Sequence, residues 1–230
     1  MTRDQLAQII DHTMLRAYAI EEDIRELCQE ALNHQFATVA VNPAWTSYCA
    51  KQLAGTGVGV CTCVGFPLGA NTAAVKVEEA RDAVRNGATE IDMVINIGAL
   101  KSGYGNFVQQ EIAAVVKAVK GIPVKVILEC CYLTEEEKVE ACQMSVRAGA
   151  AFVKTSTGYG SGGATPQDVA LLRKTVADLC GVKAAGGIRT FTEAAALVHA
   201  GANRIGTSTG VAIVRSFVEF QEAVAEEIMQ

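Results

Sequence analysis

The chain has 230 residues, of which 50% are hydrophobic and 20% charged, so it is long enough to bury one sizeable core. Its 21 glycines and 4 prolines indicate many tight turns between regular elements, not a disordered Pro/Gly-rich chain. The net charge is −5, and the lysines and arginines are scattered singly. A nucleic-acid or membrane-surface partner therefore lacks the basic patch that would attract it.

The amino-terminal sequence MTRDQLAQII shows no basic region followed by a long apolar run, so it does not resemble a secretory signal. No apolar run approaches the ~20 residues of a membrane span. We therefore expect a cytoplasmic protein. The eight cysteines lack paired C-x-x-C spacing and the three histidines lack ligand spacing, so we expect buried, reduced cysteines and no metal site.

Short β-branched runs alternate with amphipathic segments along the whole chain. The predicted strands span 9–13, 37–41, 57–64, 90–95, 124–129, 152–157, 182–185 and 204–207. The predicted helices span 21–33, 73–85, 108–119, 134–148, 166–178, 192–199 and 211–228. Eight strands alternating with helices favour a parallel sheet with right-handed crossovers, and eight strands can close a barrel. We expect a single α/β domain over residues 1–230, a (β/α)8 TIM barrel, with a doubly wound open sheet as the alternative.

Local signals support several of these boundaries. Thr134 followed by Glu137 forms a capping box, and Thr165-Pro166 supplies an N-cap and a first helical residue. Gly-Ala pairs at 87–88, 149–150 and 201–202 each precede a predicted strand, which is typical of a helix that ends in glycine. These pairs mark the entrances to three strands.

Two consecutive predicted strands carry a lysine among apolar residues, Lys154 in FVKTSTG and Lys183 in GVKAAGG. A buried ammonium is costly unless it pairs with a carboxylate such as Asp92 or Glu129. An ordinary lysine, with a pKa of about 10.4, is protonated at neutral pH and is not a nucleophile. A second ammonium nearby and partial desolvation favour the neutral amine, which forms Schiff bases with carbonyl compounds. The pair indicates this chemistry with Asp92 as the proton partner, but it does not say which lysine is the nucleophile.

Small glycine-containing turns follow the last three predicted strands: STGYGSGG at 156–163, AAGGIR at 184–189 and GTSTG at 206–210. Backbone N–H groups in such turns, with a helix behind them, bind phosphate. Barrels often place a phosphate site after strands seven and eight. Arg189 and the hydroxyls of Ser208 and Thr209 are candidates to assist. No turn matches a nucleotide-binding motif, so we expect a small phosphorylated substrate and no nucleotide cofactor.

Seven stretches of the chain closely resemble the deoxyribose-phosphate aldolase family. They are IDHTML, VGFPLG, GATEIDMVINIGALKSG, KVILE, FVKTSTG, KAAGGIRT and RIGTS, and they extend over nearly the whole chain. The resemblance implies a single (β/α)8 barrel and a class I aldolase that needs no cofactor. It implies reversible cleavage of 2-deoxy-D-ribose 5-phosphate into D-glyceraldehyde 3-phosphate and acetaldehyde, and we expect a dimer or tetramer.

The resemblance also implies roles for individual residues. The family's Schiff-base lysine falls on Lys154, the second lysine that favours its neutral form on Lys183, and the aspartate of the proton relay on Asp92. The implied substrate and phosphate contacts are Asp11, Thr13, Thr155, Gly158, Gly186, Gly187, Arg189, Gly206, Ser208 and Thr209. Three departures matter: some members have a lysine where this chain has Tyr159, many have a cysteine where it has Ala40, and some end in a tyrosine that reaches the site, whereas this sequence ends in EEIMQ.

Two other hypotheses remain open from the sequence. One is another Schiff-base sugar-phosphate aldolase of the transaldolase type, which would keep Lys154 but would not use acetaldehyde as donor. The other is an inactive barrel that binds a sugar phosphate as a sensor or scaffold. Turnover of deoxyribose 5-phosphate separates both from the leading hypothesis.

Overall fold

Eight parallel strands close into a barrel in chain order, so that β1 pairs with both β2 and β8. The computed structural model describes the backbone of residues 1–228 and the side chains of residues 1–221. The strands are β1 (Ile10–Met14), β2 (Thr38–Val41), β3 (Gly59–Val64), β4 (Glu90–Val94), β5 (Val124–Ile127), β6 (Phe152–Lys154), β7 (Gly181–Ala185) and β8 (Arg204–Thr207). The predicted (β/α)8 barrel is confirmed, and the alternative of an open sheet is wrong.

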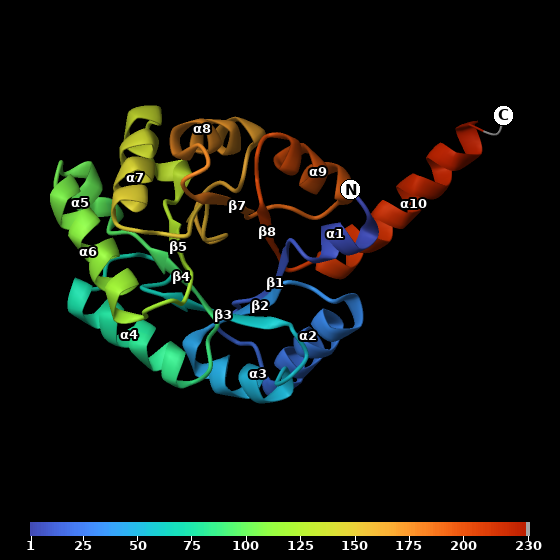
Figure 1. Cartoon of the computed structure of the whole chain (residues 1–230), viewed down its shortest axis with the longest axis horizontal. Helices are drawn as coiled ribbons and strands as arrows, with labels where there is room; N and C mark the ends of the chain where they lie inside the picture. The colour runs from blue at the N-terminus through green and yellow to red at the C-terminus, as the bar shows by residue number, and fades with distance from the viewer. Residues whose placement is uncertain (229–230) are drawn as a thin grey trace.

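Helices surround the barrel and cover its outer face (Figure 1). They are α1 (Arg3–Ala7), α2 (Glu21–His34), α3 (Thr46–Gln52), α4 (Ala73–Arg85), α5 (Ile97–Lys101), α6 (Gly105–Ala118), α7 (Glu135–Arg147), α8 (Pro166–Val176), α9 (Phe191–His199) and α10 (Gly210–Ile228), with 3-10 turns at η1 (Pro43–Trp45) and η2 (Cys130–Tyr132). All seven predicted helices are present, whereas α1, α3 and α5 were not predicted. In residues 1–228, no helix combines the length and the apolar character that a membrane crossing requires.

The predicted helix ends have the expected local chemistry. The Thr134 side chain accepts a hydrogen bond from the Glu137 backbone, and the Glu137 carboxylate accepts one of 2.8 Å from the Thr134 N–H. Thr165 caps α8 by accepting from the Asp168 N–H at 3.0 Å. The glycines at 87, 149 and 201 have φ of 97°, 83° and 115°, a region that favours glycine, so each lets a helix end and turn into the next strand.

The two faces of the strands carry different residues. Outward-facing side chains such as Ile91, Met93 and Val153 are buried in the hydrophobic core between the barrel and its helices. Side chains at the alternate positions point into the barrel, and many of them are polar. Because a barrel interior is usually filled by branched apolar side chains, the buried charges there require a specific explanation. Seven of the eight cysteines are buried as expected, and Cys131 is exposed.

Candidate active site

A cavity of about 420 Å³ opens at the carboxyl-terminal end of the barrel. Segments that follow β1, β6, β7 and β8 line it, which is where a barrel enzyme places its active site. The predicted site residues in its lining are Thr13, Lys154, Gly158, Gly186, Gly187, Arg189, Gly206 and Ser208. Eight of the thirteen predicted positions therefore surround one cavity.

Lys154 is the one lysine among the described residues that lines this cavity. It is the last residue of β6, and its side chain is 4% exposed. Its Nζ donates a hydrogen bond of 2.7 Å to Oδ2 of Asp92 on β4. The amine is thus held in place while remaining in reach of a molecule in the cavity.

Three other predicted contacts are not part of the cavity lining. Thr155 is fully buried, and its hydroxyl lies 3.2 Å from both the N–H and the carbonyl oxygen of Ala185. The Thr209 hydroxyl donates to the carbonyl of Ile188 at 3.2 Å. Asp11 is fully buried beneath the cavity. In this structure these side chains contact neighbouring protein groups, and direct contact with a substrate stays a prediction for each.

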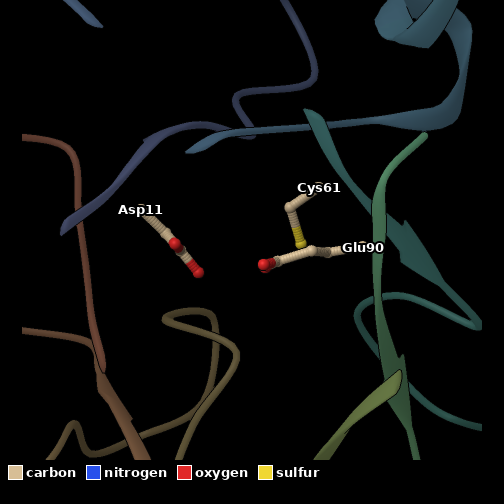
Figure 2. A group of neighbouring side chains, drawn as sticks. All are labelled: Asp11, Cys61 and Glu90. Atoms are coloured by element: carbon tan, nitrogen blue, oxygen red, sulfur yellow. The ribbon is translucent and has the colours of Figure 1, made fainter. Parts of the chain in front are cut away.

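Asp11, Cys61 and Glu90 come together inside the barrel (Figure 2). Their potential ligand atoms lie within 4.8 Å of one another, a spacing that could suit a metal ion. However, Lys183 Nζ lies 2.5 Å from Asp11 Oδ2, and Lys125 Nζ lies 2.6 Å from Glu90 Oε2. These ammonium groups already hold the carboxylates and would repel a further cation. The donor set does not fit a metal site.

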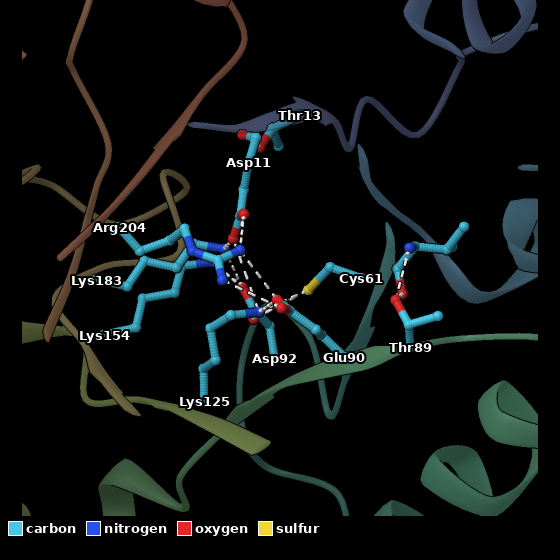
Figure 3. A network of polar contacts seen from close by, with 11 residues as sticks. Asp11, Thr13, Cys61, Thr89, Glu90, Asp92, Lys125, Lys154, Lys183 and Arg204 are labelled. Carbon is cyan, nitrogen blue, oxygen red and sulfur yellow. Dashed lines mark hydrogen bonds and ion pairs between the residues drawn. The ribbon is translucent and has the colours of Figure 1, made fainter. Parts of the chain in front are cut away.

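The charged side chains form one continuous network (Figure 3). Asp92 is at its centre, and its Oδ2 accepts hydrogen bonds from both Lys154 at 2.7 Å and Lys183 at 2.8 Å. Its Oδ1 accepts from Lys125 at 2.8 Å. Cys61 donates its S–H to the same oxygen at 3.0 Å. The structure thus pairs Asp92 with the two lysines of β6 and β7 and with a third lysine, and its role as proton partner stays a prediction.

The network fixes the charge of its buried members. Burial alone would raise the pKa of Asp92, but the ammonium groups of Lys125, Lys154 and Lys183 hold it well below its usual value. Burial alone would lower the pKa of Lys183, but Asp11 and Asp92 raise it above its usual value. Asp92 therefore stays anionic and Lys183 stays cationic around neutral pH.

The number of carboxylate partners distinguishes Lys154 from the other lysines. Lys183 contacts Asp11 and Asp92, and Lys125 contacts Asp92 and Glu90. Lys154 contacts Asp92 alone, through the oxygen that it shares with Lys183. Its ammonium has the fewest carboxylate partners of the three, and it is the one of them that lines the cavity. This geometry favours Lys154 as the nucleophile, a choice that the sequence pattern left open.

Glu129 does not pair with a buried lysine, although the sequence allowed that possibility. Its carboxylate accepts hydrogen bonds from the Thr157 hydroxyl and, at 3.2 Å, from the Thr157 N–H. Glu129 therefore anchors the loop after β6 and does not neutralise a buried lysine.

Close packing favours glycine at position 206. A Cβ at this position would lie 3.0 Å from Lys183 Cε and 3.0 Å from Ala185 Cβ. Both contacts are tighter than ordinary van der Waals contacts. The glycine therefore leaves the room that the Lys183 side chain occupies, in addition to its predicted place near phosphate.

Three members of the network were not among the predicted site residues: Glu90, Lys125 and Arg204. Glu90 lies two residues before Asp92 on β4, so the two side chains share the inner face. The same period of two, applied to every strand, would have found Glu90. Arg204 binds Asp11 at 2.7 Å across 193 residues of sequence, and only the register of the closed barrel reveals this pair.

Comparison with known proteins agrees with this geometry. The family model described as "DeoC/LacD family aldolase" matches residues 5–217. The chain belongs to this family. It is 57% identical over 212 residues to the deoxyribose-phosphate aldolase of Geobacillus sp. (strain WCH70), covering 92% of this chain and 95% of that protein. It is 56% identical over 211 residues to the enzyme of that name from Streptococcus sanguinis (strain SK36), covering 92% and 96%.

A solved structure shows the same barrel. The deoxyribose phosphate aldolase from Aeropyrum pernix, described as having a unique tetrameric structure, matches with a TM-score of 0.90 and 38% sequence identity. The match covers 95% of this chain and 93% of the other. The resemblance seen in the sequence motifs is thereby confirmed, and the chain is a class I aldolase of the DeoC type.

Proposed function

We propose that this aldolase reversibly cleaves 2-deoxy-D-ribose 5-phosphate into D-glyceraldehyde 3-phosphate and acetaldehyde, with Lys154 as the Schiff-base nucleophile. The proposal rests on the position of Lys154, which lines the cavity and shares one oxygen of Asp92 with the cationic Lys183. Relatives more than 50% identical over most of the chain bear the name of this activity.

The chemistry follows from the neutral amine of Lys154. It adds to the C1 aldehyde of the open-chain sugar, and loss of water gives an iminium ion. A base removes the proton of the C3 hydroxyl, the C2–C3 bond breaks, and its electrons move into the iminium to give an enamine. D-glyceraldehyde 3-phosphate leaves, C2 takes a proton, and water releases acetaldehyde. Asp92 contacts both lysines, which supports a role for it in passing protons between them.

We propose that the phosphate of the substrate binds beside the loops after β7 and β8, which line the same cavity as Lys154. Gly186 and Gly187 have φ of 90° and 79° and line the cavity, as does Ser208 shortly before the start of α10. Backbone N–H groups near a helix start suit an anion, and Arg189 adds a positive charge. With Tyr159 in place of the lysine found in some members, phosphate binding rests on these groups.

Covalent trapping tests the assignment of Lys154. The protein is incubated with acetaldehyde and sodium borohydride, and the reduced adduct is located by peptide mass spectrometry. We expect one adduct, on Lys154, and none in Lys154→Arg, which keeps the positive charge beside Asp92. An adduct on Lys183, or undiminished labelling in Lys154→Arg, would contradict the proposal.

Steady-state assays separate this activity from its alternatives. We expect cleavage of deoxyribose 5-phosphate with a lower KM than for unphosphorylated deoxyribose. A transaldolase-type enzyme would form the Lys154 adduct with other donors but not with acetaldehyde. A sensor barrel would bind the sugar phosphate without turnover.

Assembly and location remain proposals as well. We propose a homo-oligomer, a dimer or a tetramer, because the structurally similar Aeropyrum pernix enzyme is described as tetrameric. Light scattering coupled to size-exclusion chromatography gives the mass directly, and a mass near 24.2 kDa would contradict it. We also propose a cytoplasmic location and no nucleic-acid partner, which follow from the sequence expectations alone.

A further inference from the structure

The ion network beneath Lys154 continues to the opposite end of the barrel. Glu90 and Arg204 are the first residues of β4 and β8, so they lie at the amino-terminal end of the strands. Their side chains are 14% and 16% exposed, and Glu90 lines a separate hollow of about 450 Å³ at that end. A column of charged side chains, whose contacts are drawn in Figure 3, thus connects the partly exposed Glu90 and Arg204 to Lys154 at the cavity.

One connection through the column runs along β4 and β5. Lys125 Nζ lies 2.6 Å from Glu90 Oε2 and donates to Asp92 Oδ1 at 2.8 Å. The other carboxylate oxygen of Asp92 accepts from Lys154. Glu90 is therefore separated from the nucleophile by one lysine and one aspartate.

A second connection runs along β8, β1 and β7. Arg204 Nη1 donates to Asp11 Oδ1 at 2.7 Å, and Asp11 Oδ2 lies 2.5 Å from Lys183 Nζ. Lys183 donates to the same oxygen of Asp92 that holds Lys154. Arg204 also contacts Glu90 at 3.2 Å, which closes the two connections into one network.

We propose that Glu90 and Arg204 act as positioning residues that set the proton occupancy of Lys154 from the far end of the barrel, by fixing the total charge of the column. The inference rests on the proposed role of Lys154 as nucleophile. When ionised, the column holds four cations and three anions: Lys125, Lys154, Lys183 and Arg204 against Asp11, Glu90 and Asp92. Loss of one proton balances it, and Lys154 is the cation with the fewest carboxylate partners.

The other titratable side chains that face the column do not alter this balance. Cys61 and Cys63 on β3 point into the same space. Burial raises the pKa of Cys63 to about 11 and that of Cys61 well above its usual value. Both stay neutral thiols at the pH of the reaction. Arg16 and Arg189 line the cavity together with Lys154 and are the same in every variant, so differences between variants follow the seven charged groups of the column.

The total charge of the column determines the direction in which each substitution shifts the pH at which Lys154 loses its proton. Glu90→Gln removes an anion, so the column disfavours the ammonium of Lys154 and the amine becomes free at lower pH. Arg204→Gln removes a cation and has the opposite effect. For one charge at a distance on the order of 10 Å and an effective dielectric constant of about 20, Coulomb's law gives a shift of roughly one pH unit.

The test measures the deprotonation of Lys154 without catalysis. Competitive labelling with acetic anhydride, read at Lys154 by peptide mass spectrometry across the pH range, gives the midpoint of its reactivity. We expect the midpoint to move by about one unit to lower pH in Glu90→Gln and to higher pH in Arg204→Gln. The double variant Glu90→Gln/Arg204→Gln has the original total charge, so its midpoint should return toward the original value. Arg204→Lys keeps the positive charge and should leave the midpoint unchanged.

Several results would overturn the inference. These are unchanged midpoints in the two single variants, shifts of the same sign, or a double variant displaced further than either single one. If Glu90→Gln does not fold, as judged by circular dichroism, Arg204→Gln alone tests the inference, because its midpoint must move to higher pH. The acid limb of kcat/KM for deoxyribose 5-phosphate should move in parallel. A shifted labelling midpoint without any turnover would reject the proposed function but keep the charge coupling.

Discussion

The phenolic oxygen of Tyr159 donates a hydrogen bond of 2.6 Å to the backbone carbonyl of Leu15, and this bond joins the loop after β6 to the loop after β1. Both residues line the cavity, together with Arg16, which directly follows Leu15. The Tyr159 ring also packs edge-on against Phe66, with ring centroids 5.5 Å apart. Tyr159, the residue that replaces a lysine of some family members, therefore helps to shape the entrance of the active site.

Tyr159→Phe should weaken substrate binding more than it slows the chemistry. The substitution keeps the ring contact with Phe66 and removes one hydrogen bond, worth about 1 kcal/mol net, so KM for deoxyribose 5-phosphate should rise up to about fivefold. We expect kcat to change less than about twofold, because Lys154 is untouched. Steady-state kinetics provide the measurement, with the exposed Tyr104→Phe as control. A fall in kcat at constant KM would contradict this role.

Gly206→Ala should disturb Lys183 and lower kcat. The added methyl group would lie 3.0 Å from Lys183 Cε and from Ala185 Cβ, so one of them must give way, and we expect Lys183 to shift relative to Asp11 and Asp92. A displacement that costs about 1.4 kcal/mol of transition-state stabilisation corresponds to a tenfold loss in kcat. Gly98→Ala is the control, because its nearest neighbour would be 3.7 Å away. An unchanged kcat with a lower Tm would contradict this prediction, since Lys183 would then keep its position and Ala185 would move instead.

Much of the barrel could be predicted from the sequence because its signals are local. Short β-branched runs, amphipathic segments, the Thr134 capping box and the Gly-Ala pairs predicted all eight strands and seven helices to within a few residues. The helices α1, α3 and α5 were missed because five to seven residues are too few to establish a helical period.

The candidate site was predicted where charged residues interrupt apolar strands, as Lys154, Lys183 and Asp92 do. The column beneath them depends on contacts between distant segments. Arg204 is separated from Glu90 by 114 residues, and no local sequence pattern predicts that pair. Likewise, only the structure shows that Lys154 has fewer carboxylate partners than Lys183 does.

The stability of the protein should fall in acid because of its two central aspartates. The pKa values of Asp11 and Asp92 are held below their usual value, because the positive charges around them outweigh the effect of burial. The unfolded chain therefore takes up protons first, near pH 4. The stability that these carboxylates provide is fully present above about pH 4 and is lost as the pH falls toward their folded pKa values.

Urea unfolding between pH 3 and pH 7 measures this loss. The urea midpoint should be flat above about pH 5 and should drop below about pH 4. Asp92→Asn should flatten the acid drop, whereas Asp82→Asn, on the surface, should leave it unchanged. An equal drop in the wild-type chain and in Asp92→Asn would assign acid sensitivity to other groups.

A second buried ion pair, Lys76–Glu111, should support the fold outside the barrel. The two side chains are 0% exposed, and Lys76 Nζ lies 2.8 Å from Glu111 Oε2. Lys76 also donates to the carbonyl of Val94 at 2.9 Å, and Glu111 accepts from the Asn96 N–H at 3.1 Å, so the pair ties α4 and α6 to the end of β4. Burial lowers the pKa of Lys76 and raises that of Glu111, against the attraction between the two charges.

Breaking this pair on one side should cost more than removing it. Lys76→Met leaves a buried carboxylate without its counter-charge, and we expect a loss of about 3–5 kcal/mol in the free energy of unfolding. The double variant Lys76→Met/Glu111→Leu removes both charges, so it should be more stable than Lys76→Met alone even though Val94 and Asn96 lose partners. Urea denaturation of the two variants and of Glu111→Leu completes the cycle. If the losses of the single variants simply add in the double variant, the two charges are not coupled across α4 and α6, and the contacts to Val94 and Asn96 carry the stabilisation.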